Sequence, residues 1–64
     1  MKRSKLVKHL NSFGCKIQRE GRRHTVFMNG DGTRKSAMPR HTEIKSNLVL
    51  KICKDLGISA PEER

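Results

Sequence analysis

The sequence predicts a two-layer α+β domain with the element order α-β-β-β-α, in which two helices cover one face of a three-stranded antiparallel sheet. Apolar residues recur at helical spacing near both ends of the chain, and strand-forming residues fill its middle. Glycine-rich turns separate the middle segments. A chain of 64 residues has room for one domain. We place this domain at residues 1–58 and expect a short polar C-terminal tail at residues 59–64.

The first helix is expected to begin at Ser4, whose side chain can cap the free N–H groups of a first turn. Leu6, Val7 and Leu10 follow at helical spacing and form one apolar stripe. Gly14 lies just beyond the stripe and is a typical stop signal. The sequence therefore predicts an amphipathic, basic helix in this segment.

The first strand is expected at residues 15–20, where apolar and polar residues alternate. This pattern predicts that Cys15 and Ile17 face the core. A basic turn at residues 21–23 then leads into a second strand at residues 24–29, which is rich in strand formers. Apolar side chains lie at successive positions of this second strand, so the pattern leaves open which of its faces is buried.

A hairpin turn is expected at residues 29–32, because asparagine and glycine tolerate the positive φ angles that tight turns need. The chain then returns as a third strand at residues 34–38. Pro39 is expected to end it, since proline cannot donate a hydrogen bond to a central ladder. These three strands form an antiparallel meander.

The second helix is expected to begin with Ser46 as its cap. Leu48, Ile52 and Leu56 share one face, and Val49 and Cys53 lie beside them. Gly57, the next residue, lies where helices commonly end in a left-handed residue. With a helix at each end of the meander, the simplest packing places both apolar stripes on one face of the sheet.

Charge points to a polyanionic partner. The chain has 15 Lys and Arg residues against 6 Asp and Glu, which gives a net charge of +9. Neutralised phosphates release condensed counterions, so this composition favours nucleic acid, with an acidic protein as a compatible second partner. A surface that is basic only for solubility is the plainer alternative. Phe13 and Phe27 are the only aromatic residues and are both assigned to the core, which argues against binding by base stacking.

Several classes of protein are excluded by the sequence. The longest apolar run, at residues 48–50, is far too short to cross a membrane, and no apolar segment of a secretory signal follows the basic start. We therefore expect a cytoplasmic protein in which Cys15 and Cys53 are buried thiols, with a disulfide between them as the minor alternative. A chain this small leaves no room for a deep enclosed pocket, so any substrate is expected at the surface.

The spacing of Cys and His residues matches no zinc site, and the acidic residues do not cluster as metal-dependent nucleases require. The sequence also lacks a glycine-rich phosphate loop between a strand and a helix. We therefore expect neither a bound metal nor a small-molecule cofactor.

The three histidines offer one reaction. RNA carries its own nucleophile, the 2′-hydroxyl, so cleavage needs a base near that group and positive charge on the phosphate. His24 follows Arg22 and Arg23 at the start of a strand, where both requirements can be met. His9 is expected to be a solvated surface residue, and His41 to contact RNA.

Four segments of the chain carry a family resemblance: GCKIQREGRRHTVF at residues 14–27, NGDG at 29–32, MPRH at 38–41 and LKICKDLGI at 50–58. Their order and spacing resemble the HicA toxins, which are small bacterial mRNA interferases of type II toxin–antitoxin pairs. The resemblance implies a fold like that of double-stranded-RNA-binding domains. It also implies a catalytic histidine at the start of the second strand, which falls on His24, and a HicB-type antitoxin that covers the active site. The family usually has a small residue before this histidine, where the present chain has Arg23.

The first hypothesis is therefore a metal-independent endoribonuclease toxin that cleaves mRNA with His24 as the general base. Arg22, Arg23 and Arg40 are assigned to the phosphates, and further RNA contacts are assigned to Lys5, Lys8 and His41. The alternative is a non-catalytic RNA-binding module of the same fold, which uses the first helix and the basic turn. A structural or ribosome-associated basic protein is a third option, although such chains usually carry basic tails.

Overall fold

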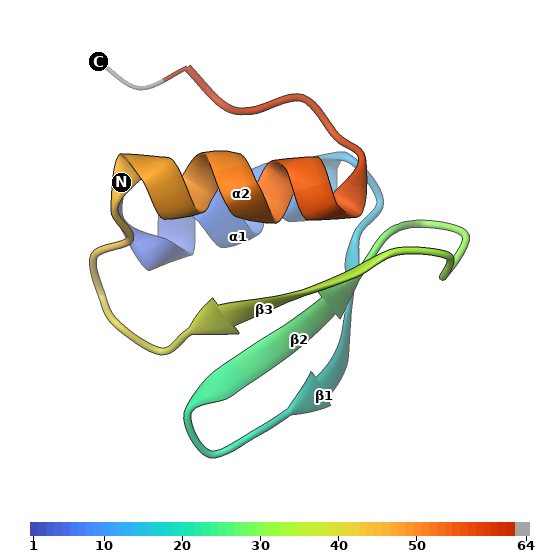
Figure 1. Cartoon of the computed structure of the whole chain (residues 1–64), viewed down its shortest axis with the longest axis horizontal. Coiled ribbons are helices and arrows are strands. Elements are labelled where there is room, and N and C mark those ends of the chain that lie inside the picture. Colours follow the sequence, from blue (N-terminus) through green and yellow to red (C-terminus); the bar gives the residue numbers. More distant parts are fainter. Residues whose placement is uncertain (63–64) are drawn as a thin grey trace.

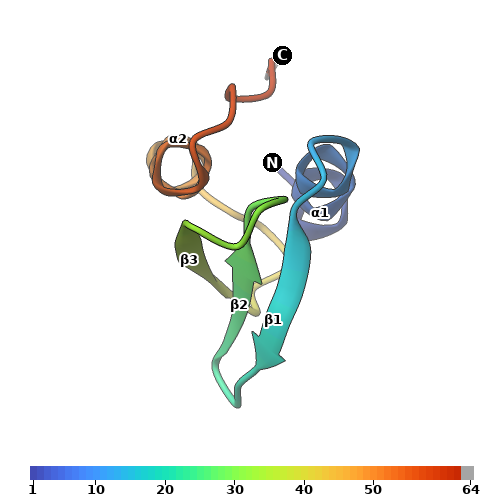
Figure 2. The same ribbon diagram turned by 90° about the vertical axis from the view of Figure 1, so that its right-hand side faces the viewer.

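The computed structural model describes residues 1–62 and contains the five predicted elements in the predicted order. They are α1 (Arg3–Ser12), β1 (Lys16–Glu20), β2 (His24–Met28), β3 (Lys35–Pro39) and α2 (Ser46–Leu56). The strands form an antiparallel sheet in the order β1-β2-β3 (Figure 1). Figure 2 shows both helices on the same side of this sheet, as predicted. Residues 58–62 are neither helix nor strand, and the last two residues of the expected tail lie outside the described residues.

Both helices begin without the predicted serine caps. Lys2 and Lys45 occupy the cap positions, and neither side chain makes a capping hydrogen bond. The Ser4 and Ser46 predictions were wrong because both helices begin before the expected position, so that both serines lie inside the helices. The backbone N–H of Arg3 donates to the carbonyl of Thr42 at 2.8 Å, which comes from the distant β3–α2 loop. At the start of α1, a tertiary hydrogen bond therefore satisfies a free N–H group that a local side-chain cap satisfies in other helices.

The end of α2 follows the prediction. Gly57 adopts a left-handed conformation with φ of 71°, and its N–H donates back to the carbonyls of the last helical turn. Glycine has no Cβ penalty in this region of backbone space. The chain can therefore leave the helix sharply at this residue.

The core lies between the helices and the inner face of β2 and β3. Thr25 and Phe27 of β2 are completely buried, whereas Val26 and Met28 are half-buried on the opposite face. This alternation settles the orientation of β2 that the sequence left open. The buried apolar residues are Leu6, Leu10, Cys15, Phe27, Met38, Ile44, Val49, Ile52, Cys53 and Leu56.

Two apolar residues assigned to the core are exposed. Ile17 is 49% exposed, as are the other four residues of β1, which contribute no side chain to the buried core. Phe13 is 45% exposed and lies against the His9 ring, with centroids 4.9 Å apart. Phe27 is therefore the single aromatic residue in the core. In α2, Leu48 is half-buried beside the main buried stripe.

Cys15 and Cys53 are both buried and unlinked, as predicted. Burial raises the pKa of both thiols above the ordinary value of 9.0. The nucleophilic form of a cysteine is the thiolate, so these two residues are poor nucleophiles.

Asp55 couples α2 to β3 and gives the fold an acid-sensitive contact. Its Oδ2 accepts a hydrogen bond from Ser36 Oγ at 3.0 Å and pairs with Lys51 Nζ at 2.9 Å. The hydrogen bonds from Lys51 and then from Ser36 hold the pKa of Asp55 below its ordinary value of 3.8. The stabilisation is therefore fully present above pH 3.8 and is lost as the pH falls through the lowered pKa of the folded state.

We expect Asp55→Asn to be less stable than the native chain at neutral pH and equally stable at a pH below the folded-state pKa, where both side chains are uncharged. Urea unfolding followed by circular dichroism at the two pH values measures this difference. An equal loss at both pH values would contradict the assignment.

Candidate nucleic-acid interface

His24 is the first residue of β2, and its side chain is exposed. Its neighbour Thr25 points toward the helices, so His24 lies on the free face of the sheet together with Val26 and Met28. Within residues 1–62, its imidazole makes no hydrogen bond or ion pair. Both ring nitrogens are therefore open to a molecule that approaches this face.

The turn before His24 carries two exposed arginines, Arg22 and Arg23. The N–H of Gly21 donates to the carbonyl of His24 at 2.8 Å and closes this turn. A Cβ at Gly21 would lie 2.8 Å from that same oxygen, so the turn requires glycine there. The close approach of Gly21 to the His24 carbonyl therefore fixes the backbone conformation of the turn that carries Arg22, Arg23 and His24.

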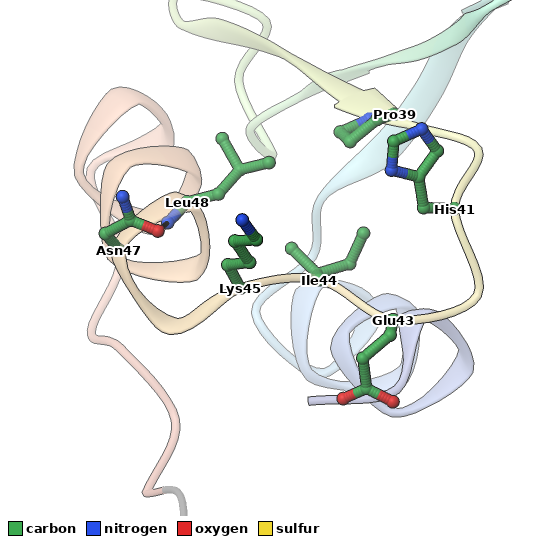
Figure 3. Close-up of a pocket in the computed structure, with 7 residues that line it drawn as sticks. All are labelled: Pro39, His41, Glu43, Ile44, Lys45, Asn47 and Leu48. Atoms are coloured by element: carbon green, nitrogen blue, oxygen red, sulfur yellow. Dashed lines mark hydrogen bonds between the residues drawn. The ribbon is translucent and has the colours of Figure 1, made fainter.

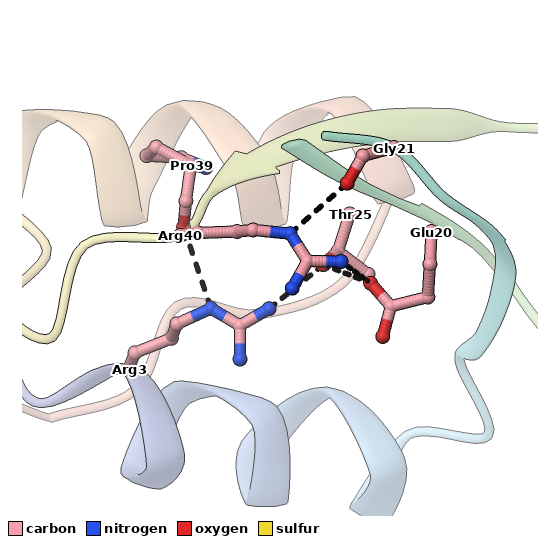
Figure 4. Close-up of polar contacts among 6 residues, drawn as sticks. All are labelled: Arg3, Glu20, Gly21, Thr25, Pro39 and Arg40. Carbon is pink, nitrogen blue, oxygen red and sulfur yellow. Dashed lines mark hydrogen bonds and ion pairs between the residues drawn. The ribbon is translucent and has the colours of Figure 1, made fainter. Parts of the chain in front are cut away.

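Arg40, which directly follows β3, contacts the turn at residues 21–23 and the end of β1 (Figure 4). Its Nε donates to the carbonyl of Gly21 at 3.0 Å, and its Nη2 pairs with Glu20 Oε1 at 2.8 Å. The backbone N–H of Arg40 also donates to the carbonyl of Arg23 at 3.3 Å. The structure thus brings Arg40 to the turn that carries Arg22 and Arg23, where part of its guanidinium is engaged with Gly21 and Glu20.

A second arginine completes the polar network at this end of the sheet. Arg3 of α1 donates from Nη2 to Thr25 Oγ1 at 2.8 Å, and Thr25 donates to Glu20 Oε1 at 2.6 Å. Arg3 Nε also lies 3.4 Å from the carbonyl oxygen of Pro39 (Figure 4). The Thr25 hydroxyl is completely buried, so these bonds satisfy a polar group that burial would otherwise penalise. They link α1 to the strand that carries His24.

The free face of the sheet also holds basic residues that the local sequence pattern does not single out. Lys16 and Lys35 lie opposite Met28 in the two ladders, and Arg19 lies opposite Val26. Directly opposed residues share a face, so these three side chains lie on the same face as His24. The buried face of β2, together with the register of the strands, identifies these three residues.

Lys5 and Lys8 are exposed on α1, away from His24. Leu6 and Leu10 direct the opposite side of this helix into the core, so both lysines face away from the sheet. The structure does not bring these two predicted contacts together with the histidine.

His41 lies in the β3–α2 loop, on the rim of a surface pocket of about 380 Å³ (Figure 3). The pocket is lined by Pro39, His41, Glu43, Ile44, Lys45, Asn47 and Leu48. Glu43 points away from the other side chains in Figure 3, and its carboxylate pairs with the amino group of Met1 at 2.8 Å. The polar groups left around the pocket are neutral or basic.

His9 is more than a solvated surface residue, contrary to prediction. Its Nε2 lies 2.7 Å from the carbonyl oxygen of Ser59, and its ring lies against Phe13. The C-terminal segment folds back over α1, a contact between residues 50 positions apart that local sequence could not indicate. His9 is therefore engaged in the fold.

Two further findings concern the described part of the chain. Within residues 1–62, no group of three His, Cys, Asp or Glu side chains is arranged to hold a metal ion. None of the helices in this range has the length and apolar character needed to cross a membrane.

Comparison with protein families gives a match that covers most of the chain. Residues 3–58 match the family model described as the HicA toxin of bacterial toxin-antitoxin. The matched region includes all five helices and strands, together with the turn before His24 and the β3–α2 loop. Comparisons with curated proteins and with solved structures gave no match.

Proposed function

Because the chain belongs to the HicA toxin family of bacterial toxin–antitoxin systems, we propose that it is an endoribonuclease that cleaves mRNA without a metal ion. His24 is the general base in this proposal, and the turn arginines bind the phosphate. The observation that carries the proposal is the exposed imidazole of His24, which makes no hydrogen bond or ion pair within residues 1–62 and directly follows two exposed arginines.

The chemistry needs little from the protein. His24 takes the proton of a ribose 2′-hydroxyl, whose oxygen then attacks the adjacent phosphorus. The bond from phosphorus to the 5′-oxygen breaks, which leaves a 2′,3′-cyclic phosphate on one fragment. The 5′-oxygen of the other fragment takes up a proton from water and leaves as a hydroxyl, and His24 returns its proton to the solvent. Arg22 and Arg23 stabilise the negative charge that develops on the phosphorane oxygens.

Arg40 has a positioning role in this proposal. Its bonds to Gly21 and Glu20 hold the turn that carries the phosphate-binding arginines. A contact from the remaining N–H groups of Arg40 to RNA is compatible with that role, because its side chain is 45% exposed. The bulky Arg23, which stands where the family usually has a small residue, adds a phosphate ligand next to the base.

Family membership also supports a protein partner, a HicB-type antitoxin. We propose that it covers His24 and the free face of the sheet, and that the toxin acts on mRNA in the cytoplasm when the antitoxin is lost. The basic side chains Lys16, Arg19 and Lys35 on this face suit an acidic partner surface or RNA equally well.

The test is cleavage of single-stranded RNA by the purified protein in excess EDTA, with DNA of the same sequence as the control. We expect the RNA to be cut to fragments with 2′,3′-cyclic phosphate ends and the DNA to stay intact, since DNA lacks the 2′-hydroxyl. RNA that is bound but never cut would favour the non-catalytic RNA-binding alternative. Cleavage that requires added metal would contradict the mechanism.

A further inference from the structure

We propose that the pocket in the β3–α2 loop binds one nucleobase of the RNA, next to the phosphodiester that is cleaved at His24. This inference rests on the proposed function and deepens it, because the pocket would set which base stands beside the cleaved bond. Its volume of about 380 Å³ falls within the roughly 300–1,000 Å³ of ordinary ligand sites.

The pocket has the two kinds of surface that recognise an unpaired base. Pro39, Ile44 and Leu48 supply apolar walls for the faces of a planar ring (Figure 3). The exposed His41 ring on the rim can stack on the base, as histidine commonly does in sites for single-stranded RNA. Apolar walls alone would not distinguish one base from another.

Asn47 supplies the polar edge that can distinguish bases. Its Oδ1 accepts the backbone N–H of Leu48 at 2.9 Å, which orients the amide. The Nδ2 group makes no hydrogen bond within residues 1–62, so its two N–H donors remain open. An amide donor fits the carbonyl oxygens of guanine and uracil, and Lys45 adds a further exposed donor to the lining.

The pocket lies beside the proposed catalytic residue. Pro39, which forms one wall, is the direct partner of His24 in the β2–β3 ladder. Directly opposed residues in an antiparallel pair have Cβ atoms about 4.5–5.5 Å apart. A base seated against Pro39 is therefore within one nucleotide of a phosphate held at His24 and the turn arginines.

The charge around the pocket suits an RNA segment, and its apolar walls with an amide donor suit a base. The carboxylate of Glu43 is engaged by the amino group of Met1, so the groups facing the pocket are neutral or cationic. Arg40 and Lys45 lie on either side of His41 in the same loop, where they can meet the phosphates on both sides of the base.

The test compares Asn47→Asp with Asn11→Asp. The first variant keeps the Oδ1 that binds Leu48 and replaces the amide donors with a second acceptor. The second makes the same change of charge on exposed Asn11 of α1. Each ¹⁵N-labelled protein is titrated with the four nucleoside 5′-monophosphates, and cleavage is measured on four RNA oligonucleotides that differ in the base beside the cleaved bond.

We expect nucleotides to shift the NMR signals of residues 39–48. In Asn47→Asp the base preference of nucleotide binding and of RNA cleavage should move by about five- to tenfold. The change should be from guanine and uracil toward adenine and cytosine, which present amino donors. Asn11→Asp should keep the native preference.

The remaining outcomes separate this inference from the proposed function. One outcome is that RNA is cleaved, but nucleotides shift no NMR signals of residues 39–48 and Asn47→Asp keeps the native base preference. This outcome would overturn the base-binding pocket and support the nuclease function. Nucleotide binding at these residues without RNA cleavage would uphold base binding and overturn the nuclease. Weaker antitoxin binding by Asn47→Asp with an unchanged base preference would identify a protein-binding surface and overturn the inference.

Discussion

Replacement of His24 by alanine is expected to lower the rate of RNA cleavage by about 10²- to 10⁴-fold, the usual contribution of a general base. The same substitution should abolish growth arrest when the protein is overproduced without its antitoxin. His24 is exposed and makes no side-chain hydrogen bond within residues 1–62, so its removal should leave the fold intact. The assay is cleavage of a fluorescent RNA oligonucleotide in excess EDTA.

His9→Gln is the matched control for the His24 variant. It also removes an imidazole from the basic surface, but His9 lies on α1, where it contacts Ser59 and Phe13. We expect this variant to cleave RNA at the native rate. Circular dichroism and thermal unfolding establish that both variants are folded. A His24→Ala protein that cleaves RNA as fast as the native chain would refute the assignment of the base.

Phe27→Ala is expected to have the largest effect on stability, a loss of about 3–5 kcal/mol. Phe27 is completely buried and is the largest side chain in the core. A single core in a domain of this size rarely supplies more than about 3–5 kcal/mol in total. The variant should therefore be largely unfolded at 25 °C, as measured by urea and thermal unfolding followed by circular dichroism.

Phe13→Ala makes the same substitution at a position that is 45% exposed, and it is expected to cost less than about 1 kcal/mol. The pair of variants tests whether Phe27 is a core residue and Phe13 a surface residue, although the sequence alone assigns both to the core. A similar loss of stability in both variants would contradict this division.

Local pattern predicted the elements well because their signals lie close together in the chain. Helical spacing marks α1 and α2, and Gly57 ends α2 as expected. The serine caps failed for a different reason. Ser4 is a good capping residue by preference, but α1 begins at Arg3, where the carbonyl of Thr42 meets the N–H of Arg3 across the fold. A contact between residues so far apart cannot be seen in either segment alone.

The candidate site likewise has residues that are adjacent in the sequence and residues whose positions only the fold determines. Arg22, Arg23 and His24 are adjacent in the chain, so any strand that begins at His24 keeps them together. The fold adds Arg40 through its bonds to the turn. It leaves Lys5 and Lys8 on the far side of α1, because the apolar stripe of that helix fixes which side faces solvent.

The amino-acid sequence by itself determined the order of elements, the basic character of the surface and the position of the histidine after a basic turn. These depend on periodicity, composition and adjacency, which are local properties. Only the tertiary structure decided which face of β2 is buried, and therefore that His24 shares the free face with Lys16, Arg19 and Lys35. Apolar side chains lie on both faces of β2, and the choice between them was made by the helices that pack on Thr25 and Phe27.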